Sequence, residues 1–248
     1  IVLRNLDIIR GKTVTQFDED GVRLDDGSSV TWDQIENGRV AESLQADFDT
    51  MLAQLGSPLY RIRQRLAIND YRGLLPQAEA MYGQFQNRDS ETAYMVCQAL
   101  MWSRLAVGQR AAALSPFLRC LEHLRRAQAN DTEITLPGSR RLQVDLETGF
   151  SPELPPIWFD NSAAEEQLPE VTRTIAAMEK PHLPATRVYY ATLALAANQP
   201  QLASQVLNGL TQLPDWKRVV EAQVQLSSGD AQAAVNSLQP HIDSLSPE

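Results

Sequence analysis

One spacing occurs four times along the chain and limits what the chain can fold into. A glycine or asparagine stands between two stretches of helical periodicity at Asn69, Gly108, Asn198 and Gly229. Each time a leucine lies three residues before this turn residue, and apolar residues lie five and nine residues after it. Two apolar helical stripes joined by a residue that tolerates a left-handed backbone describe a helical hairpin. The sequence therefore predicts several helical hairpins packed in series.

The aligned positions also predict which side chains are buried. We expect the four leucines to occupy equivalent buried positions in a right-handed stack of hairpins. They are Leu66, Leu105, Leu195 and Leu226. The residue five positions after the turn is small or apolar, so that the two helices can approach closely, and it is Leu74, Ala113, Ala203 or Ala234.

This pattern resembles the tetratricopeptide family, in which each repeat is one helix pair. The best match is the segment LSSGDAQAAVNSL at 226–238. The turn-to-turn distances of 39, 90 and 31 residues depart from the family period of about 34. The resemblance therefore implies only the hairpin architecture and its extended concave face, which suits peptide or protein partners.

The first forty residues follow a different pattern, with apolar residues at alternate positions. The alternating runs are broken at Asp20-Gly21 and Asp26-Gly27, and Asp-Gly pairs favour hairpin turns. We expect a β meander of at least three strands, forming either a small open barrel or a curled sheet that leans on the helices that follow. It resembles the SH3-like and Sm-like barrels. The predicted fold class is α+β, mainly α, with a β module at 1–40 and a helical repeat domain at 41–248, whose first clear helix begins at Ser57-Pro58.

A segment at 131–160 interrupts the helical pattern. Apolar residues alternate on both sides of Pro137-Gly138, which predicts a β-hairpin insertion. The segment ends in two prolines followed by Ile157, Trp158 and Phe159. Such a loop covers apolar surface at the end of a helical stack, which we favour, or forms the wall of a ligand groove. In the second case Trp158 and Phe159 bind the partner.

Charge is distributed unevenly along the chain. Residues 57–130 carry ten basic and five acidic side chains, while the flanking segments and the whole chain, at −9, are acidic. This charge argues against a nucleic-acid or anionic-lipid coat. Arg61, Arg65 and Arg72, with Arg63 beside them, either pair with carboxylates of this chain, which we favour, or line a groove for an acidic peptide. We interpret the acidic runs at 18–20 and 25–26 as solvated turns.

Residues with catalytic chemistry are scarce. No nucleophile elbow, metalloprotease or phosphate-loop motif is present, and the three histidines lie far apart. We therefore predict no enzyme activity, no cofactor and no metal site. Cys97 and Cys120 lie at similar distances from the turn at Gly108, and we expect neighbouring, buried thiols.

These observations lead to one functional hypothesis and two alternatives. The hypothesis is a non-catalytic protein–protein interaction scaffold. The alternatives are a carbohydrate or small-ligand binding protein, and an accessory subunit of an enzyme. The arrangement of a β module, degenerate hairpins and a proline-aromatic loop resembles uncharacterised secreted proteins of planctomycete-like bacteria. We expect a periplasmic or secreted location, with a cytoplasmic one as the alternative, and no membrane span. The missing initiator methionine is explained equally by a cleaved signal or by trimming.

Overall fold

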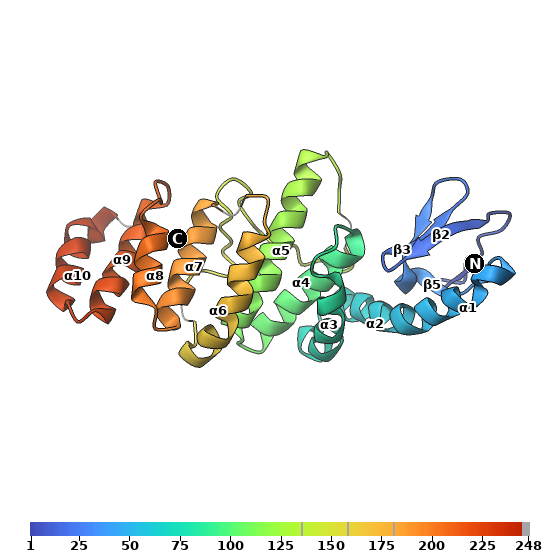
Figure 1. Ribbon diagram of the computed structural model, residues 1–248, viewed down its shortest axis with the longest axis horizontal. Helices are drawn as coiled ribbons and strands as arrows, with labels where there is room; N and C mark the ends of the chain where they lie inside the picture. Colours follow the sequence, from blue (N-terminus) through green and yellow to red (C-terminus); the bar gives the residue numbers. More distant parts are fainter. Residues whose placement is uncertain (135, 158, 181, 245–248) are drawn as a thin grey trace. The chain divides into compact units, whose positions relative to one another are not determined.

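The computed structural model of the protein describes residues 1–134, 136–157, 159–180 and 182–244 (Figure 1). It is mainly helical, with a small antiparallel β-sheet at the N-terminus, which confirms the α+β, mainly α, fold class. The chain forms two compact units: unit 1 is 1–107 with 131–140, and unit 2 is 108–130 with 141–248. The boundary between the units therefore falls after residue 107, and the β module shares a unit with the first helices.

The β module contains two antiparallel sheets. Strands β2 (Val14–Asp18), β3 (Gly21–Leu24) and β4 (Ser29–Val30) form the predicted meander, in the order β2-β3-β4. Strands β1 (Val2–Leu3) and β5 (Ile35–Asn37) pair separately. Gly27, in the turn between β3 and β4, has a φ of +83°, which is the left-handed backbone that the Asp-Gly signal predicts.

An aromatic cluster joins the β module to the first helix. Phe17 of β2, Trp32 and Phe48 of α1 (Glu42–Met51) have ring centroids 5.3–6.0 Å apart, and the Trp32 and Phe48 side chains are fully buried. The indole Nε1 of Trp32 donates a hydrogen bond of 2.7 Å to the carbonyl of Asp18. The alternating residues of the module thus find their core partly within a helix, as expected for a sheet too small to bury both faces.

The helices of unit 1 begin earlier than the sequence predicts. Helix α1 continues through a π-helical turn, Leu52–Gly56, directly into α2 (Ser57–Ala67), so Ser57 does not cap a new helix. A proline inside an α-helix removes one hydrogen bond and collides with the carbonyl four residues earlier. The wider π turn before Pro58 accommodates that loss. Helices α3 (Tyr71–Phe85) and α4 (Glu91–Ala106) complete the helical part of unit 1.

Unit 2 is built from consecutive helices that pack on their neighbours. Helix α5 (Arg110–Ala129) packs on α6 (Asn161–Ala176), and α6 packs on α7 (Pro184–Ala196). Helices α8 (Pro200–Leu207), α9 (Pro214–Ser227) and α10 (Ala231–Leu238) follow, with a 3-10 helix at Gln239–Ser244. Among the residues that the structure describes, no helix is both long and apolar enough to cross a membrane.

The four aligned turns share one backbone geometry. Asn69, Gly108, Asn198 and Gly229 have φ between +56° and +85°. In three of these turns, the amide after the turn residue donates to a carbonyl five residues earlier: Asp70 to Arg65, Gln199 to Ala194, and Asp230 to Gln225, at 2.8–2.9 Å. This bond, together with the left-handed residue, defines a Schellman-type helix end. The left-handed turn residue is therefore confirmed at all four positions, and the helices on either side of the turns at Asn69, Asn198 and Gly229 pack as the predicted hairpins.

The aligned residues after the turns are buried as predicted, but the aligned leucines before the turns are not. Leu74, Ala113, Ala203 and Ala234 are all buried. Of the four leucines, however, Leu66 is buried, Leu105 and Leu195 are half-buried, and Leu226 is 55 % exposed, so the prediction of four equivalent buried leucines is wrong. The equivalent buried position lies one helical turn earlier, at Ile62, Met101, Ala191 and Ala222. The leucines sit in the last turn of their helices, at the end of the helix contact.

The predicted β-hairpin at 131–160 is also wrong. The described residues of this segment contain no strand. Its backbone is held instead by local turns and by bonds to helices, such as the amide of Ser151 to the hydroxyl of Tyr189 at 3.1 Å and Arg110 Nη2 to the carbonyl of Pro155 at 2.7 Å. Leu136, Leu142 and Leu154 are buried. The alternating pattern therefore reflects an irregular chain lying on helices.

The two cysteines are both buried. Cys97 lies in α4 of unit 1 and Cys120 in α5 of unit 2, and neither sulfur is solvent-exposed. They are not joined in a disulfide. The prediction of buried thiols is confirmed.

Candidate functional site

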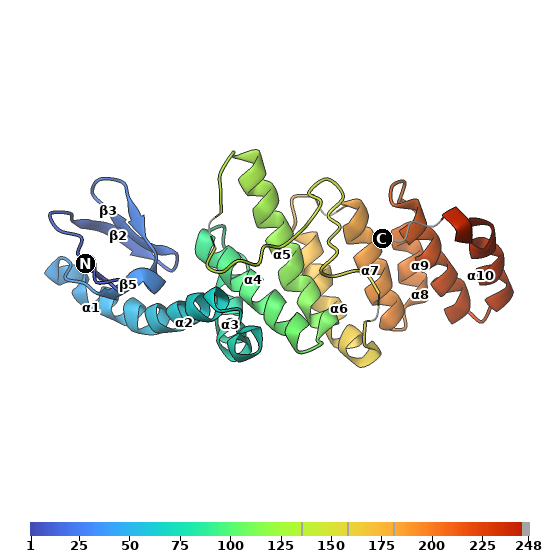
Figure 2. The ribbon, with the colours of Figure 1, turned by 180° about the vertical axis from the view of Figure 1, so that it is seen from behind.

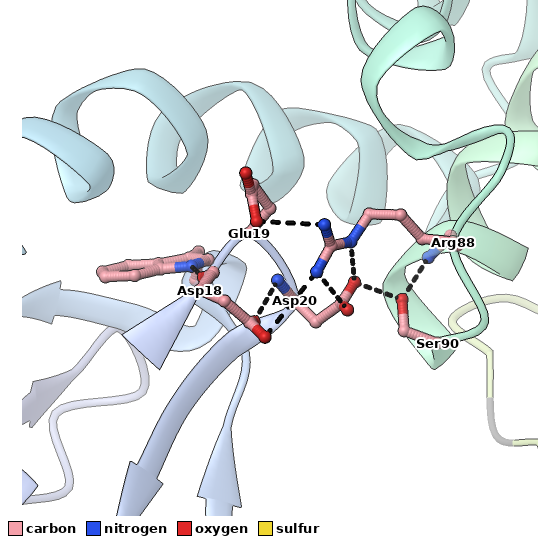
Figure 3. A network of polar contacts seen from close by, with 7 residues as sticks. Asp18, Glu19, Asp20, Arg88 and Ser90 are labelled. Atoms are coloured by element: carbon pink, nitrogen blue, oxygen red, sulfur yellow. Dashed lines mark hydrogen bonds and ion pairs between the residues drawn. The ribbon is translucent and has the colours of Figure 1, made fainter. Parts of the chain in front are cut away.

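Arg88 connects the β module to the helices of unit 1 (Figure 3). Its guanidinium donates to both carboxylate oxygens of Asp20, at 2.7 and 3.0 Å, and to Glu19 Oε2 at 3.0 Å. Asp18 Oδ2 lies 3.7 Å away. Arg88 follows α3, while the three acidic residues surround the turn between β2 and β3. One guanidinium thus fixes this turn to the helical part of the unit.

Ser90 adds a second connection at the same place. Its hydroxyl donates to Asp20 Oδ1 at 2.6 Å and accepts from the amide of Ala93 at 3.0 Å as the N-cap of α4. Burial alone would raise the pKa of Asp20, but hydrogen bonds from Arg88 and Ser90 and the charge of Arg88 hold this pKa below its ordinary value of 3.8. The same contacts raise the pKa of Arg88. Both shifts favour the charged forms of Asp20 and Arg88 in the folded protein.

We expect Arg88→Ala to lower the free energy of unfolding by about 1–3 kcal/mol, because it leaves partly buried carboxylates without their donor. The loss is pH-dependent. Since the pKa of Asp20 is depressed on folding, its contribution is complete above pH 4 or so and disappears as the pH falls through the folded-state pKa. Urea unfolding between pH 2 and pH 7 measures whether the free energies of unfolding of Arg88→Ala and of the wild type converge as the pH falls. Arg10→Ala, at an exposed residue, is the charge-matched control; a constant difference between Arg88→Ala and the wild type at all pH values would contradict the assignment.

A cleft of about 480 Å³ lies beside this cluster in unit 1. One wall is formed by β2, β3 and β4, and the other by the first residues of α4. Its polar lining comes mainly from acidic and hydroxyl side chains: Asp18, Asp20, Ser29, Thr31, Asp89, Ser90, Glu91 and Thr92, with Gln16 and Arg23. Arg88 and Ser90 tie the β2–β3 turn, which belongs to one wall, to the start of α4, which belongs to the other.

Glu91 is the carboxylate of this cleft whose pKa is raised by its surroundings. Desolvation raises its pKa, the negative charge of Asp33 adds to the rise, and the positive charge of Arg63 only partly opposes it. A bound cation would favour the ionised form of this group and would itself be stabilised. The cleft is therefore suited to a positively charged ligand or side chain. In the described part of the chain, no group of three or more His, Cys, Asp or Glu side chains is arranged to hold a metal ion.

A second cleft of about 440 Å³ lies at the other side of the β module's contact with α2, lined by residues of β1, of the 3-10 turn Trp32–Gln34 and of α2. Its charges are already paired within the chain. The buried carboxylate of Asp33 binds Arg63, and Arg4 pairs with Glu36 at 2.9 Å while lying 4.5 Å from the centroid of the Tyr60 ring. Each charged side chain of this lining is thus already engaged by an opposite charge of the same unit.

The structure does not gather the sequence-predicted arginines into one groove. Arg65 pairs with Asp70 at 2.5 Å, Arg72 donates to the carbonyl of Ala106 at 3.2 Å, and Arg61 is exposed. With Arg63 on Asp33, two of the four arginines on this stretch meet carboxylates of the chain. Arg63 thus meets a carboxylate of the acidic N-terminal segment, as favoured from the charge distribution, whereas the partner of Arg65 lies within the basic segment itself.

Sequence reasoning missed Arg88, and it misread the acidic turn. The run Asp18-Glu19-Asp20 was interpreted as a solvated turn, but it binds the guanidinium of Arg88. The available signal was a cluster of three acidic residues in a module that needs an anchor, and a lone arginine just before a helix cap at Ser90. Nearly seventy residues separate the two, so only the fold brings them together.

The aromatic candidates lie in unit 2. Phe159 is 8 % exposed, which is the burial that a loop covering apolar surface requires. Trp158 lies outside the described residues. His123 is buried in α5, and His182 and His241 lie on other elements, so the histidines form no common site.

Comparison with known proteins leaves these features as the only guide to function. No protein-family model, no curated protein and no solved structure matches the chain. The likeness to tetratricopeptide hairpins and to small β barrels thus stays a resemblance of pattern. What the protein does has to be argued from the geometry of unit 1 and of the helical hairpins.

Proposed function

We propose that the protein is a non-catalytic interaction protein, and that the cleft between the β module and α4 receives a basic segment of a protein partner. The observation that carries this proposal is the lining of the cleft, in which carboxylates of the β2–β3 turn face Asp89 and Glu91 at the start of α4. The repeated helical hairpins support it, because helix pairs in series supply broad faces for protein contacts. The resemblance to secreted proteins supports an extracytoplasmic location as part of the same proposal.

The wall of the cleft favours a side chain on an extended segment over an isolated ion. Its two sides come from an open three-stranded sheet and a helix end, and its lining mixes carboxylates with hydroxyl and amide groups. An arginine or lysine entering from a chain lying along the sheet would find charge at Glu91 and hydrogen-bond acceptors around it.

Titration of labelled peptides into the full chain tests this proposal. Arginine- and lysine-rich peptides are compared with neutral and acidic peptides of equal length, by fluorescence anisotropy at two salt concentrations. We expect binding of the basic peptides alone, weakened by salt. Glu91→Lys should weaken it tenfold or more, since it replaces an attraction with a repulsion in the wall of the cleft.

The matched control is Asp47→Lys, the same reversal at an exposed position of α1 outside the cleft. Equal weakening by the two variants would show a general effect of net charge and would contradict the assigned cleft. Circular dichroism checks that both variants fold. Because Glu91 must be ionised to attract a cation, binding should also decline as the pH falls through its raised pKa.

A small-ligand binding protein is the second candidate. The volume of about 480 Å³ lies in the range of small-molecule pockets, and the polar lining suits a hydroxyl-rich ligand. A thermal-shift screen of neutral sugars distinguishes the two functions. Stabilisation by a sugar that Gln16→Ala abolishes would favour this candidate, because Gln16 lines the cleft and carries no charge.

A further inference from the structure

Two aromatic side chains of unit 1 hold an arginine that arrives from far along the chain. Tyr71, at the start of α3, and Trp102, in α4, have ring centroids 6.0 Å apart. The guanidinium carbon of Arg140 lies 3.7 Å from the centroid of Trp102 and 5.5 Å from that of Tyr71. A cation at these distances is attracted by both ring faces.

Arg140 belongs to a short segment, residues 136–140, which we call the strap. Figure 2 shows the chain after α5 returning beside α4, and the contacts place this segment in unit 1. The Leu136 side chain is 5 % exposed. Gly138 has a φ of +88°, and a Cβ there would lie 2.6 Å from the carbonyl oxygen of Leu66, so only glycine fits. Every second residue of the strap, Leu136, Gly138 and Arg140, is thus buried in unit 1 or lies close against it.

The strap touches the unit as a peptide ligand would. It contains no helix or strand, and its contacts are an apolar side chain, a close backbone approach and a cation on aromatic rings. Arg140 stays solvent-exposed although it covers Trp102, whose side chain is only 1 % exposed. An incoming guanidinium can therefore reach the edge of this contact from solvent.

We propose that Tyr71 and Trp102 form a recognition site for an arginine on an extended peptide, and that the strap occupies this site in cis. The fitting partner segment carries an apolar residue four positions before the arginine and glycine two positions before it, as the strap does. The site is separate from the carboxylate-lined cleft, and it stands or falls independently of the proposed function.

A peptide that binds this site has to displace the strap. A segment tethered to its site is present at a millimolar effective concentration, so a peptide added in trans binds the wild-type chain weakly. An exposed cation–π contact corresponds to about a two- to fivefold change in affinity. Expelling the whole strap removes the competitor and should have the larger effect.

The test uses a fluorescein-labelled peptide with the sequence of residues 133–141 and the full chain. Gly138→Val should expel the strap, because a β-branched side chain suits neither the left-handed backbone nor the space beside Leu66. We expect this variant to bind the peptide tenfold or more tightly than the wild type. Arg140→Ala in the full chain should give a two- to fivefold gain. Ser139→Ala, at an exposed strap residue, should give none.

Two changes on the binding side complete the design. A peptide with alanine in place of Arg140 should bind the Gly138→Val chain at least twofold more weakly than the labelled peptide does. The labelled peptide itself should lose at least twofold in affinity when Trp102→Leu is added to the Gly138→Val chain. Equal binding of the peptide by wild type and by both strap variants would overturn the proposal. Equal displacement by tetramethylammonium would overturn the peptide part and leave a general cation site. If Gly138→Val does not fold, as judged by circular dichroism, Arg140→Ala decides the outcome.

Discussion

Replacing Trp32 by alanine is expected to lower the free energy of unfolding by about 3–5 kcal/mol, the largest single effect in unit 1. The indole is fully buried between Phe17 and Phe48, at centroid distances of 6.0 and 5.3 Å. Its removal opens a cavity at the joint between the module and α1, and it also leaves the Asp18 carbonyl without its donor.

Guanidinium chloride unfolding of the full chain, followed by circular dichroism, measures this loss. Ile8→Ala provides the control, because Ile8 belongs to the same module and is 51 % exposed. We expect this control to change the free energy of unfolding by no more than about 0.5 kcal/mol. A loss below about 1 kcal/mol in Trp32→Ala would show that the aromatic cluster is not the core of the joint.

The second large effect concerns two leucines at the same aligned position. Leu66→Ala should cost about 2–5 kcal/mol, whereas Leu226→Ala should change stability by no more than about 0.5 kcal/mol. Leu66 is buried in α2, while Leu226 at the end of α9 is 55 % exposed. Denaturant unfolding of both variants measures the difference. Equal losses would restore the equivalence of the four leucines that their spacing predicted.

The turns could be predicted from the sequence because their cause is local. A left-handed residue is needed where a helix ends and its partner begins, and glycine and asparagine meet that need at Asn69, Gly108, Asn198 and Gly229. The meander followed from the same kind of signal at Gly27. Burial of the leucines is not local, because it depends on which element covers the end of each helix. The spacing could therefore locate the hairpins without locating their shared contact.

The segment at 131–160 shows a second limit. Alternation of apolar residues is typical of a strand on a core, but it arises equally when an irregular chain crosses helices and turns alternate side chains inward. Leu136 and Leu142 are buried in this way, yet they belong to different units. A periodicity of two residues does not distinguish these cases without a partner strand.

The residues of the candidate site were harder to predict from the sequence than the turns, because their roles depend on contacts between distant parts of the chain. The charge distribution predicted that arginines of the middle third meet carboxylates within the chain, as Arg63 and Arg65 do. It did not single out Arg88, whose partners lie in the β module, or Glu91, whose pKa is raised by its surroundings. Both properties follow from how the β2–β3 turn and Asp33 lie near the start of α4, and no short motif encodes that position.

The order of the strap and α5 in the chain has a consequence for biosynthesis. Unit 1 needs residues 131–140, but the ribosome makes the whole of α5, a helix of unit 2, before it reaches them. At about 5–20 residues per second, the interval from residue 108 to residue 140 lasts about 2–7 s. During it, Trp102 lacks its cover from Arg140, and α5 still waits for α6. The nascent chain thus exposes two unfinished surfaces at once, and a chaperone that binds aromatic and aliphatic surface would find its target in this interval.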